Sequence, residues 1–561
     1  MNLGIGVSVL HELRILEADP VVVGQVTTAQ SPAVTYSYAY DAAHRMQRVT
    51  DSRGNKTLSY AWSPGGKLNT LQDNDGHRTD YLYDPVGRLS GIWAANDDYV
   101  SFAYDAAGRL AEKWFPNGVN AIYTWNADNT LAELKNRVNY SDSAMVSRHD
   151  YTYNGIGLRI SAEDTVGGAT PPAANDAYAY DPVGNRTAKD DGTTPLYYVY
   201  DAANQLKETR QTNASGSLLA AMVYDANGNL TRKCEGGSVS TDGTTCSGNT
   251  VTGLGYNALD QLVQVSKTGQ STQTYAYDDQ GRRIKKAVGA SSPNYLYNGS
   301  DIEAEYQNQN WNQAGALYTQ GPNTDDPIMR VDAANDASYY HKDGLGSVVA
   351  TTDLSGNLTA AQLYDAWGNP HQSTKLNSIP QYGYTGREPD ETGLVYYRAR
   401  YYDPTIGRFT QRDPIGLRGG VNQYAYALGN PVTNTDPGGT DVFIGGHIAA
   451  ANPIFDIGNL PTLVGGAPAY HLNIVLIPNQ PGDFSNRNGW SSLANGQPIA
   501  TLGGQPGGAS SWTNPLGNLI SSPNNAGDSI FNDTFLQRVE TPKGMTDTQF
   551  INRLIERAGS Y

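Results

Sequence analysis

Two aspartate–proline pairs stand close together late in the sequence, and their carboxylates could carry out hydrolytic chemistry. Asp413 precedes Pro414, and Asp436 precedes Pro437, 23 positions further on. Two carboxylates that lie close together cannot both ionise, so one keeps a proton while the other can activate water. If these two side chains meet in the folded chain, their types predict acid–base catalysis of hydrolysis.

Aspartate before proline is also a common turn residue, so the same pattern has a purely structural interpretation. An aspartate side chain accepts hydrogen bonds from nearby backbone amides, and it thereby caps a turn. On spacing alone, turn capping is the favoured interpretation of both residues. Catalysis requires the chain between them to fold back, which the turn signals Ile415-Gly416, Gly419-Gly420 and Asn430-Pro431 allow.

A tyrosine-rich repeat upstream forms the scaffold that must position these carboxylates. Its unit is aromatic-x-aromatic-Asp/Asn, often followed by two small residues, Gly and Arg, as in YLYDPVGR from Tyr81 and FAYDAAGR from Phe102. Aromatic residues at i and i+2 point to one face of a strand. The acidic or amide residue caps a turn and the glycine supplies a positive φ, so each copy predicts a hairpin. The spacing of 21 residues from Asp84 to Asp105 is typical of stacked supersecondary units.

Composition favours a mainly β protein with two or more units. A chain of 561 residues exceeds one ordinary core, and 61 Gly and 38 Tyr against 9 Phe suit many short, half-buried strands joined by tight turns. The repeat tyrosines are interpreted as sheet core rather than as a ligand cage. The net charge of −16 argues against a large nucleic-acid footprint. No apolar run is long enough to predict a spanning helix, and the first twenty residues do not resemble a secretory signal.

Several motifs near the end of the repeat occur in a fixed order. They are HKDGLGS, YDAWGNP, YTGREPDETGLVYYRARYYDPTIGRF, DPIGL and GGVNQYAYALGNP. Together with the upstream units, which resemble YD repeats, this segment is similar to the repeat-associated core of the Rhs family. The resemblance covers roughly residues 31–440. It implies a β-hairpin spiral that closes into a hollow shell around a variable C-terminal toxin.

The resemblance also implies a domain order and an autoproteolytic site. We expect residues 1–30 to be a lead-in whose abrupt start suggests the edge of a fragment, 31–338 the YD-repeat shell, 339–440 the core, and 441–561 a small α/β toxin domain. Either the toxin domain is truncated, or its resemblance to a hydrolase, given below, is wrong. By position, the catalytic carboxylates of the family fall on Asp413 and Asp436, and its assisting arginine falls on Arg400. The implied cut lies between Thr440 and Asp441. The family usually has leucine where this chain has Thr440.

The two cysteines leave two interpretations open. Cys234 and Cys246 flank the loop EGGSVSTDGTT, so a disulfide could close a hairpin in an oxidising compartment. They could equally remain loop thiols. Neither has a histidine partner at ligand spacing, so the pair predicts no zinc site, and no motif in the chain predicts a cofactor.

After position 440 the repeat stops and a different pattern begins. The segment YHLNIVLIP around His471 predicts a buried strand, QPIATLGG predicts a second short strand, and residues 541–560 predict a helix. This order weakly resembles the first part of a circularly permuted papain-like hydrolase, in which His471 would be the general base. A structural role for His471 beside an apolar strand is the favoured alternative. His447 is a weaker candidate for the base.

These patterns together predict a polymorphic toxin of the Rhs type, secreted or delivered by a specialised apparatus. Its expected partners are its own C-terminal domain as enclosed cargo and an immunity protein. The rival interpretation is a non-enzymatic cell-surface adhesion protein that uses YD repeats as a scaffold. The composition break after Thr440 favours the toxin, because an adhesin tail would more naturally continue the repeat.

Overall fold

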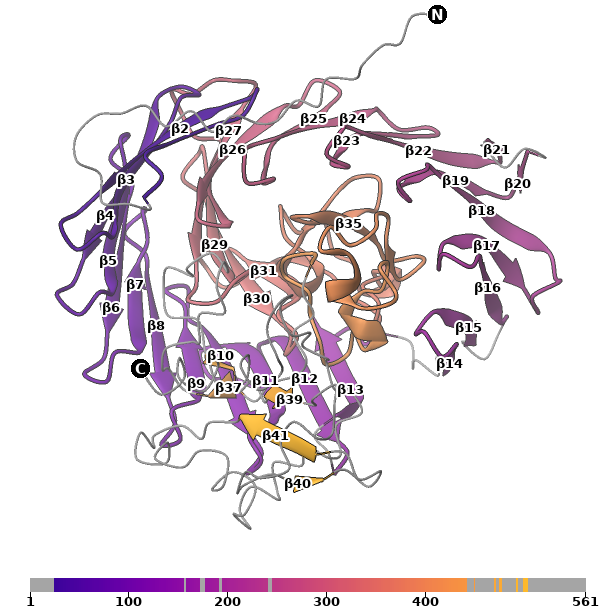
Figure 1. Ribbon diagram of the computed structural model, residues 1–561. Coiled ribbons are helices and arrows are strands. Elements are labelled where there is room, and N and C mark those ends of the chain that lie inside the picture. Colours follow the sequence, from indigo (N-terminus) through magenta and orange to yellow (C-terminus); the bar gives the residue numbers. More distant parts are fainter. Residues whose placement is uncertain are drawn as a thin grey trace, which may run out of the picture. The chain divides into compact units, whose positions relative to one another are not determined.

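The computed structural model describes residues 25–155, 158–171, 177–190, 194–240 and 245–440, and the backbone of five short strands between 448 and 502. The chain divides into two compact units, the first holding most of the residues up to 445 and the second most of those after it. Two long meanders, each an antiparallel sheet whose strands follow one another in sequence order, make up most of the first unit (Figure 1).

The first sheet has 13 strands. They are β1 (Thr28–Gln30), β2 (Thr35–Tyr40), β3 (Met46–Asp51), β4 (Lys56–Trp62), β5 (Leu68–Asp73), β6 (Arg78–Tyr83), β7 (Leu89–Trp93), β8 (Tyr99–Tyr104), β9 (Leu110–Trp114), β10 (Val119–Trp125), β11 (Leu131–Val138), β12 (Met145–Tyr153) and β13 (Arg159–Val166).

The second sheet has 17 strands. They are β14 (Ala177–Tyr180), β15 (Arg186–Asp190), β16 (Leu196–Tyr200), β17 (Leu206–Gln211), β18 (Leu218–Tyr224), β19 (Leu230–Glu235), β22 (Thr250–Tyr256), β23 (Leu262–Lys267), β24 (Gln273–Tyr277), β25 (Arg283–Val288), β26 (Pro293–Asn298), β27 (Asp301–Gln307), β28 (Ala316–Gln320), β29 (Pro327–Asp332), β30 (Ala337–Lys342), β31 (Val348–Thr352) and β32 (Leu358–Ala361).

Each repeat forms the predicted hairpin, and the copy at Asp84 shows why. The Asp84 carboxylate accepts the backbone amides of Val86 at 3.1 Å and Arg88 at 2.8 Å, and Gly87 has a φ of 83°. The Arg88 side chain returns to the same carboxylate at 2.7 Å. The strand register shifts by one residue just before the second aromatic, Tyr83. A type I turn followed by a glycine bulge produces this pattern and fits the right-handed twist of a hairpin.

The second aromatic side chain of the unit donates a hydrogen bond. This explains why tyrosine, which has a hydroxyl group, outnumbers phenylalanine. The Tyr83 hydroxyl donates to the carbonyl of Leu68 at 2.9 Å, and the Tyr104 hydroxyl donates to that of Leu89 at 2.8 Å. Where tryptophan replaces tyrosine, the indole of Trp125 makes the equivalent bond 15 residues back. Each ring therefore buries its apolar face on one hairpin and ties its polar atom to the hairpin before it.

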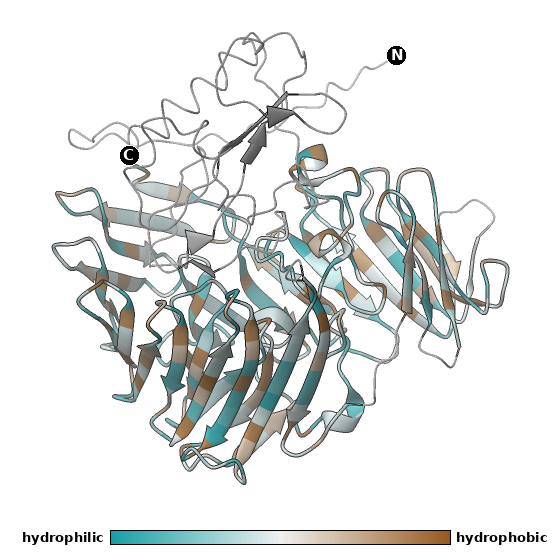
Figure 2. Cartoon of the chain, turned by 90° about the horizontal axis from the view of Figure 1, so that it is seen from below, coloured by the Kyte–Doolittle hydropathy of each residue, from teal (hydrophilic) through white to brown (hydrophobic). Residues whose placement is uncertain are grey.

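The buried faces of the sheets merge into shared cores. One core combines residues of the first sheet, such as Ile92 and Val100, with Ile328 and Val349 of the second sheet. Tyr81 and Tyr83 both pack against this core, as the same-face prediction requires. Hydrophilic and hydrophobic residues alternate along many strands (Figure 2), which is the pattern of sheets with one buried face.

The segment from Leu363 to Thr440, orange in Figure 1, departs from the meander. It contains a small four-stranded sheet and four short 3-10 helices joined by irregular chain. These elements are β33 (Glu388–Pro389), β34 (Val395–Tyr397), β35 (Arg400–Asp403), β36 (Arg408–Phe409), η1 (Gln372–Thr374), η2 (Tyr384–Gly386), η3 (Gly416–Gly419) and η4 (Ala427–Gly429). The predicted mainly β fold is confirmed, although the backbone of this segment is largely irregular.

Its irregular backbone is stabilised by tyrosine packing and by buried ions. Tyr397, Tyr402 and Tyr426 form a buried cluster, with the rings of Tyr402 and Tyr426 4.5 Å apart. The fully buried Arg283 of β25 reaches into the same segment and pairs with Glu388 at 2.7 Å. Burial of aromatic surface and of paired charge replaces the strand ladder as the source of order here.

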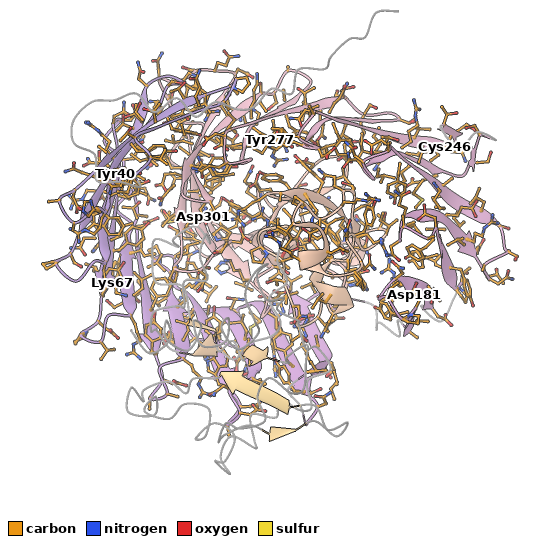
Figure 3. All side chains as sticks on the ribbon, viewed as in Figure 1. Tyr40, Lys67, Asp181, Cys246, Tyr277 and Asp301 are labelled. Carbon is orange, nitrogen blue, oxygen red and sulfur yellow. A yellow bond between two sulfur atoms is a disulfide. The ribbon has the colours of Figure 1, made fainter. Side chains whose placement is uncertain are left out.

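Cys234 and Cys246 form a disulfide that closes a small hairpin of β20 (Ser238–Val239) and β21 (Cys246–Ser247). Cys246, labelled in Figure 3, begins β21, and this hairpin lies between β19 and β22 along the chain. The open question between thiols and disulfide is thus resolved for the folded chain.

In the second unit, β39 (Ile474–Leu476) pairs antiparallel with β41 (Pro498–Leu502), which also pairs with β40 (Ser491–Ser492). Another pair joins β37 (Ile448–Ala449) to β38 (Ala469–Tyr470). Strand residues occur in both stretches predicted as strands, the first of them divided between β38 and β39. The expected helix lies outside the described residues. Among the described residues there is no helix with the length and apolar character to cross a membrane.

Candidate active site

Arg400 occupies the centre of the candidate site. It begins β35, directly after the tight turn from β34, and its backbone pairs with Tyr397. Its side chain is only 2% exposed, and its guanidinium lies over the ring of Phe409, 3.7 Å from the centroid. Stacking on this ring limits the orientation of the guanidinium, so its nitrogens point in defined directions.

Both predicted carboxylates reach this arginine. The Oδ2 atoms of Asp413 and Asp436 lie 3.1 and 3.3 Å from the same Nη2 atom of Arg400. Two atoms bound to one nitrogen at those distances are at most about 6.4 Å apart, which is within the reach of one bridging water. Asp413 is 7% exposed and Asp436 is fully buried.

The remaining oxygen of each carboxylate caps a turn. Oδ1 of Asp413 accepts the amide of Ile415 at 3.0 Å, and Oδ1 of Asp436 accepts the amide of Thr440 at 3.1 Å. The two interpretations of these residues are therefore compatible, because one oxygen does each job. Capping also fixes both carboxylates in place, since a side chain held at one oxygen presents the other in a defined direction.

Burial makes Asp436 a weaker acid than an ordinary aspartate. Loss of water around its carboxyl raises its pKa to about 6, against the lowering effects of Arg400 and of the Thr440 amide. The neighbouring charge of Asp413 pushes the pKa in the same upward direction as burial. A carboxyl of this kind retains its proton well above the normal range for aspartate, as a general acid must.

Residues 437–440 turn beside the arginine and are held there by hydrogen bonds. The amide of Ala399 donates to the carbonyl of Gly438 at 3.2 Å, and Nε of Arg400 donates to the carbonyl of Gly439. Gly439 has a φ of 67°, and a Cβ there would lie 2.2 Å from the carbonyl oxygen of Tyr397. Only glycine allows the chain to pass so close to the hairpin.

Two supporting features were missed by sequence reasoning. The carbonyl of Gln423 accepts both the amide of Asp413 at 2.9 Å and Nη1 of Arg400 at 3.0 Å, so it ties the two residues together. A Cβ on Gly419 would lie 2.3 Å from Oδ2 of Asp413. The sequence predicts only a turn at Gly419-Gly420. Only the folded structure shows that the residue beside Asp413 must be small.

Thr440 is half-buried at the end of the described first unit, and its amide contacts Asp436 as given above. Asp441, His447 and His471 lie outside the described residues, so their predicted roles stay predictions.

A serine–histidine–aspartate arrangement lies elsewhere in the first sheet. His149 contacts Asp164 through Nδ1 at 2.7 Å and Ser147 through Nε2 at 3.1 Å. Ser147 and His149 are both fully buried, and the Ser147 hydroxyl also accepts from Asn136 at 2.8 Å. A nucleophile without access to a substrate cannot serve a hydrolase, so we interpret this group as a polar network between strands.

Asp73, Asp75 and His77 could geometrically hold a cation. However, they belong to a repeat turn: Asp73 accepts the amides of both other residues at 2.9 Å, and Asp75 pairs with the ammonium of Lys56. Turn capping and an ion pair account for the cluster.

Comparisons with known proteins agree with the fold. The Teneurin YD-shell family model matches residues 129–418, slightly more than half of the chain, and the RHS Repeat model matches residues 83–113. The tRNA nuclease WapA of Bacillus subtilis is 32% identical over 280 residues, which are 48% of this chain and 11% of WapA. The double-stranded DNA deaminase toxin A of Burkholderia cenocepacia is 28% identical over 336 residues, 52% of this chain and 22% of that protein.

Two solved structures share this fold. A crystal structure of TcdB2-TccC3-TEV covers 73% of this chain with a TM-score of 0.54 at 20% identity, and the match takes in 24% of that chain. The Tc holotoxin pore of Photorhabdus luminescens, with a substitution in TccC3, matches 76% of this chain and 24% of its own, again with a TM-score of 0.54, at 19% identity. This chain thus spans between about a tenth and a quarter of the length of these relatives. The repeat geometry and the family match together show that the chain belongs to the teneurin YD-shell family and carries RHS repeats.

Proposed function

We propose that the first unit is the shell of a polymorphic toxin whose last segment cuts its own chain between Thr440 and Asp441. The observation that carries the proposal is the shared contact of Asp413 and Asp436 with one nitrogen of Arg400, beside the amide of Thr440. The chain itself is the substrate, so proximity replaces affinity.

The two carboxylates take different roles in the proposed step. Asp436 is the acid, because burial raises its pKa to about 6. Asp413 is the base, since it is the less buried of the two carboxylates and also lies beside the Arg400 cation. Nε of Arg400 donates to the carbonyl of Gly439, one residue before the scissile bond. Its positive charge is proposed to stabilise the negative charge that develops on the Thr440 carbonyl in the transition state.

The hydrolysis balances as follows. Asp413 takes a proton from a water molecule, whose oxygen forms a bond to the carbonyl carbon of Thr440. Asp436 gives its proton to the nitrogen of Asp441 as the carbon–nitrogen bond breaks. The products are a carboxyl group on Thr440 and an amine on Asp441, and the two catalytic aspartates have exchanged protonation states. No cofactor or metal takes part in the proposed step.

The test is a denaturing gel with intact-mass measurement of the products. We expect the 561-residue chain to divide into pieces of 440 and 121 residues. Asp413→Asn or Asp436→Asn should leave one full-length band, because an amide neither holds the acid proton nor activates water. Asp353→Asn is the matched control, since Asp353 caps a repeat turn in the same way at 2.9 Å but has no contact with Arg400. Equal cutting by the wild type and both site variants would remove the assignment.

The released piece is proposed to be the toxic cargo, enclosed until it is delivered to a target cell by a secretion apparatus and neutralised in the producer by an immunity protein. The named toxins among the relatives motivate this role. Its chemistry is proposed to be that of a papain-like hydrolase with His471 as base. Expression without an immunity partner should stop growth, and His471→Ala should relieve the arrest. Growth unaffected by the wild-type chain would favour the rival adhesion role.

A further inference from the structure

Arg398 lies at the tip of the hairpin between β34 and β35, two residues before the arginine of the site. Its backbone is in the left-handed region, with a φ of 54°, which is uncommon for residues other than glycine. Its Nη1 donates to the carbonyl of Pro437, the residue that follows Asp436. Residues 398, 399 and 400 therefore contact the carbonyls of 437, 438 and 439 in turn.

Asp325, a residue of the repeat shell, binds the same guanidinium. Nη2 of Arg398 lies 2.7 Å from Oδ1 of Asp325, and Nη1 lies 3.2 Å from its Oδ2. Asp325 lies in the loop between β28 and β29, 73 residues earlier in the chain. A second carboxylate from the repeat shell, that of Asp301 (labelled in Figure 3), lies 3.5 Å from Nη2 of Arg398. A two-point contact of this kind sets the plane of the guanidinium as well as its position.

The shell loop is itself held tightly. Arg387 pairs with the Asp325 carboxylate, and Nζ of Lys342 donates to the Asp325 carbonyl at 3.2 Å. A Cβ on Gly386 would lie 2.3 Å from that carbonyl oxygen, so the core segment and the loop are in close contact. The position of the Asp325 carboxylate thus depends on the completed packing of the shell around β29 and β30.

We propose that Arg398 positions the scissile segment and that Asp325 acts through Arg398, so that cleavage proceeds only after this shell loop has packed. The inference rests on the proposed self-cleavage and adds two residues to it. The simpler alternative is a clamp between shell and core with no effect on the reaction. Two observations favour positioning: the arginine contacts the scissile segment itself, and a side chain is kept at a backbone conformation that suits glycine.

The first experiment measures the rate of cleavage after timed cell-free synthesis. Arg398→Gln and Arg398→Gly should slow cleavage by about a hundredfold, because misplacement of a reacting segment by about 1 Å has an effect of that order. Arg398→Gly suits the turn, so its slow cleavage would reflect the lost side chain rather than backbone strain. Arg398→Lys should recover part of the rate. The control is Lys233→Gln, which removes a buried shell-to-core pair with Asp403 at 2.8 Å without touching residues 437–440.

A double-mutant cycle then tests whether Asp325 acts through Arg398. Asp325→Asn alone should slow cleavage, and it should add little in the Arg398→Gln background. The pH at which the rate halves should stay the same in every variant, since the acid and the base are unchanged. Additive effects, or an equal loss of rate in Lys233→Gln, would overturn the proposal in favour of a general clamp.

A second readout does not depend on cleavage. In the uncut Asp413→Asn chain, hydrogen exchange of a peptide covering residues 436–440 should be slow, and Arg398→Gln should speed it at least tenfold while Lys233→Gln leaves it unchanged. If the wild type fails to cut, the proposed self-cleavage is wrong, and this exchange result alone decides whether Arg398 holds the segment. Unchanged exchange in Arg398→Gln would refute the positioning role.

Discussion

Replacing Asp436 by asparagine should stabilise the shell at neutral pH and have no such effect in acid. The comparison is made in an Asp413→Asn background, so that both chains stay uncut. The pKa of Asp436 is raised from 3.8 to about 6 on folding, chiefly by burial, which the background substitution leaves in place. A shift of about two units corresponds to about 3 kcal/mol at about 1.4 kcal/mol per unit.

The sign follows from proton binding. Because the folded state binds this proton more tightly, the favourable contribution of Asp436 is complete below about pH 4 and is lost as the pH rises through about 6. Asparagine has no proton to lose. The background substitution removes the smaller raising effect of the Asp413 charge on the pKa of Asp436. The double variant should therefore gain up to about 3 kcal/mol relative to Asp413→Asn between pH 4 and pH 7.5, in addition to any constant offset from the changed hydrogen bonds.

Guanidinium unfolding followed by tryptophan fluorescence measures this difference, with the shift in midpoint multiplied by a common slope. Other titrating groups are the same in both chains, so their contributions cancel. A difference that stays flat across this pH range, or that falls as pH rises, would show that Asp436 ionises normally in the shell. The assignment of Asp436 as the acid would then be wrong.

Three further predictions concern the supports of the site and shell. Gly439→Ala should prevent cleavage on the denaturing gel, because its Cβ would lie 2.2 Å from a backbone carbonyl oxygen, whereas Gly416→Ala, with a φ of 65° and open space, should cut normally; equal cutting would contradict this steric argument. Arg283→Met should lower the unfolding free energy by about 3 to 5 kcal/mol, because the buried carboxylates of Glu388 and Asp390 lose their ion pairs with Arg283. A change below about 1 kcal/mol in denaturant unfolding would contradict this. Replacing Cys234 and Cys246 together by serine should cost up to about 3 kcal/mol in the same assay, the expectation for a loop closed over 12 residues, and reductant should have no effect on that variant.

The repeat was predictable because its causes are local. Aromatic residues two apart, a capping aspartate and a glycine with positive φ specify a hairpin within about ten residues, and the copy at Asp84 has each of these features. The bond from Tyr83 to the preceding hairpin was not specified in this way. It joins residues 15 positions apart, and its acceptor is a backbone carbonyl that carries no sequence signal.

The segment from Leu363 onward shows where local patterns stop being sufficient. Its chain follows few ladders and instead depends on tyrosine clusters and on ions such as Arg283, which come from distant strands. The YD pattern does not predict this irregular backbone, because buried contacts rather than periodicity select its conformation.

By itself, the sequence determined which residues of the site can titrate and where the chain can turn. It placed Asp413 and Asp436 at turns, and each does cap one. Only the tertiary structure decided that their second oxygens converge on Arg400 and that the Asp436 carboxyl is desolvated by burial. The physical reason is that a pKa depends on burial and on the charges nearby, and both are set by packing between segments far apart in the chain.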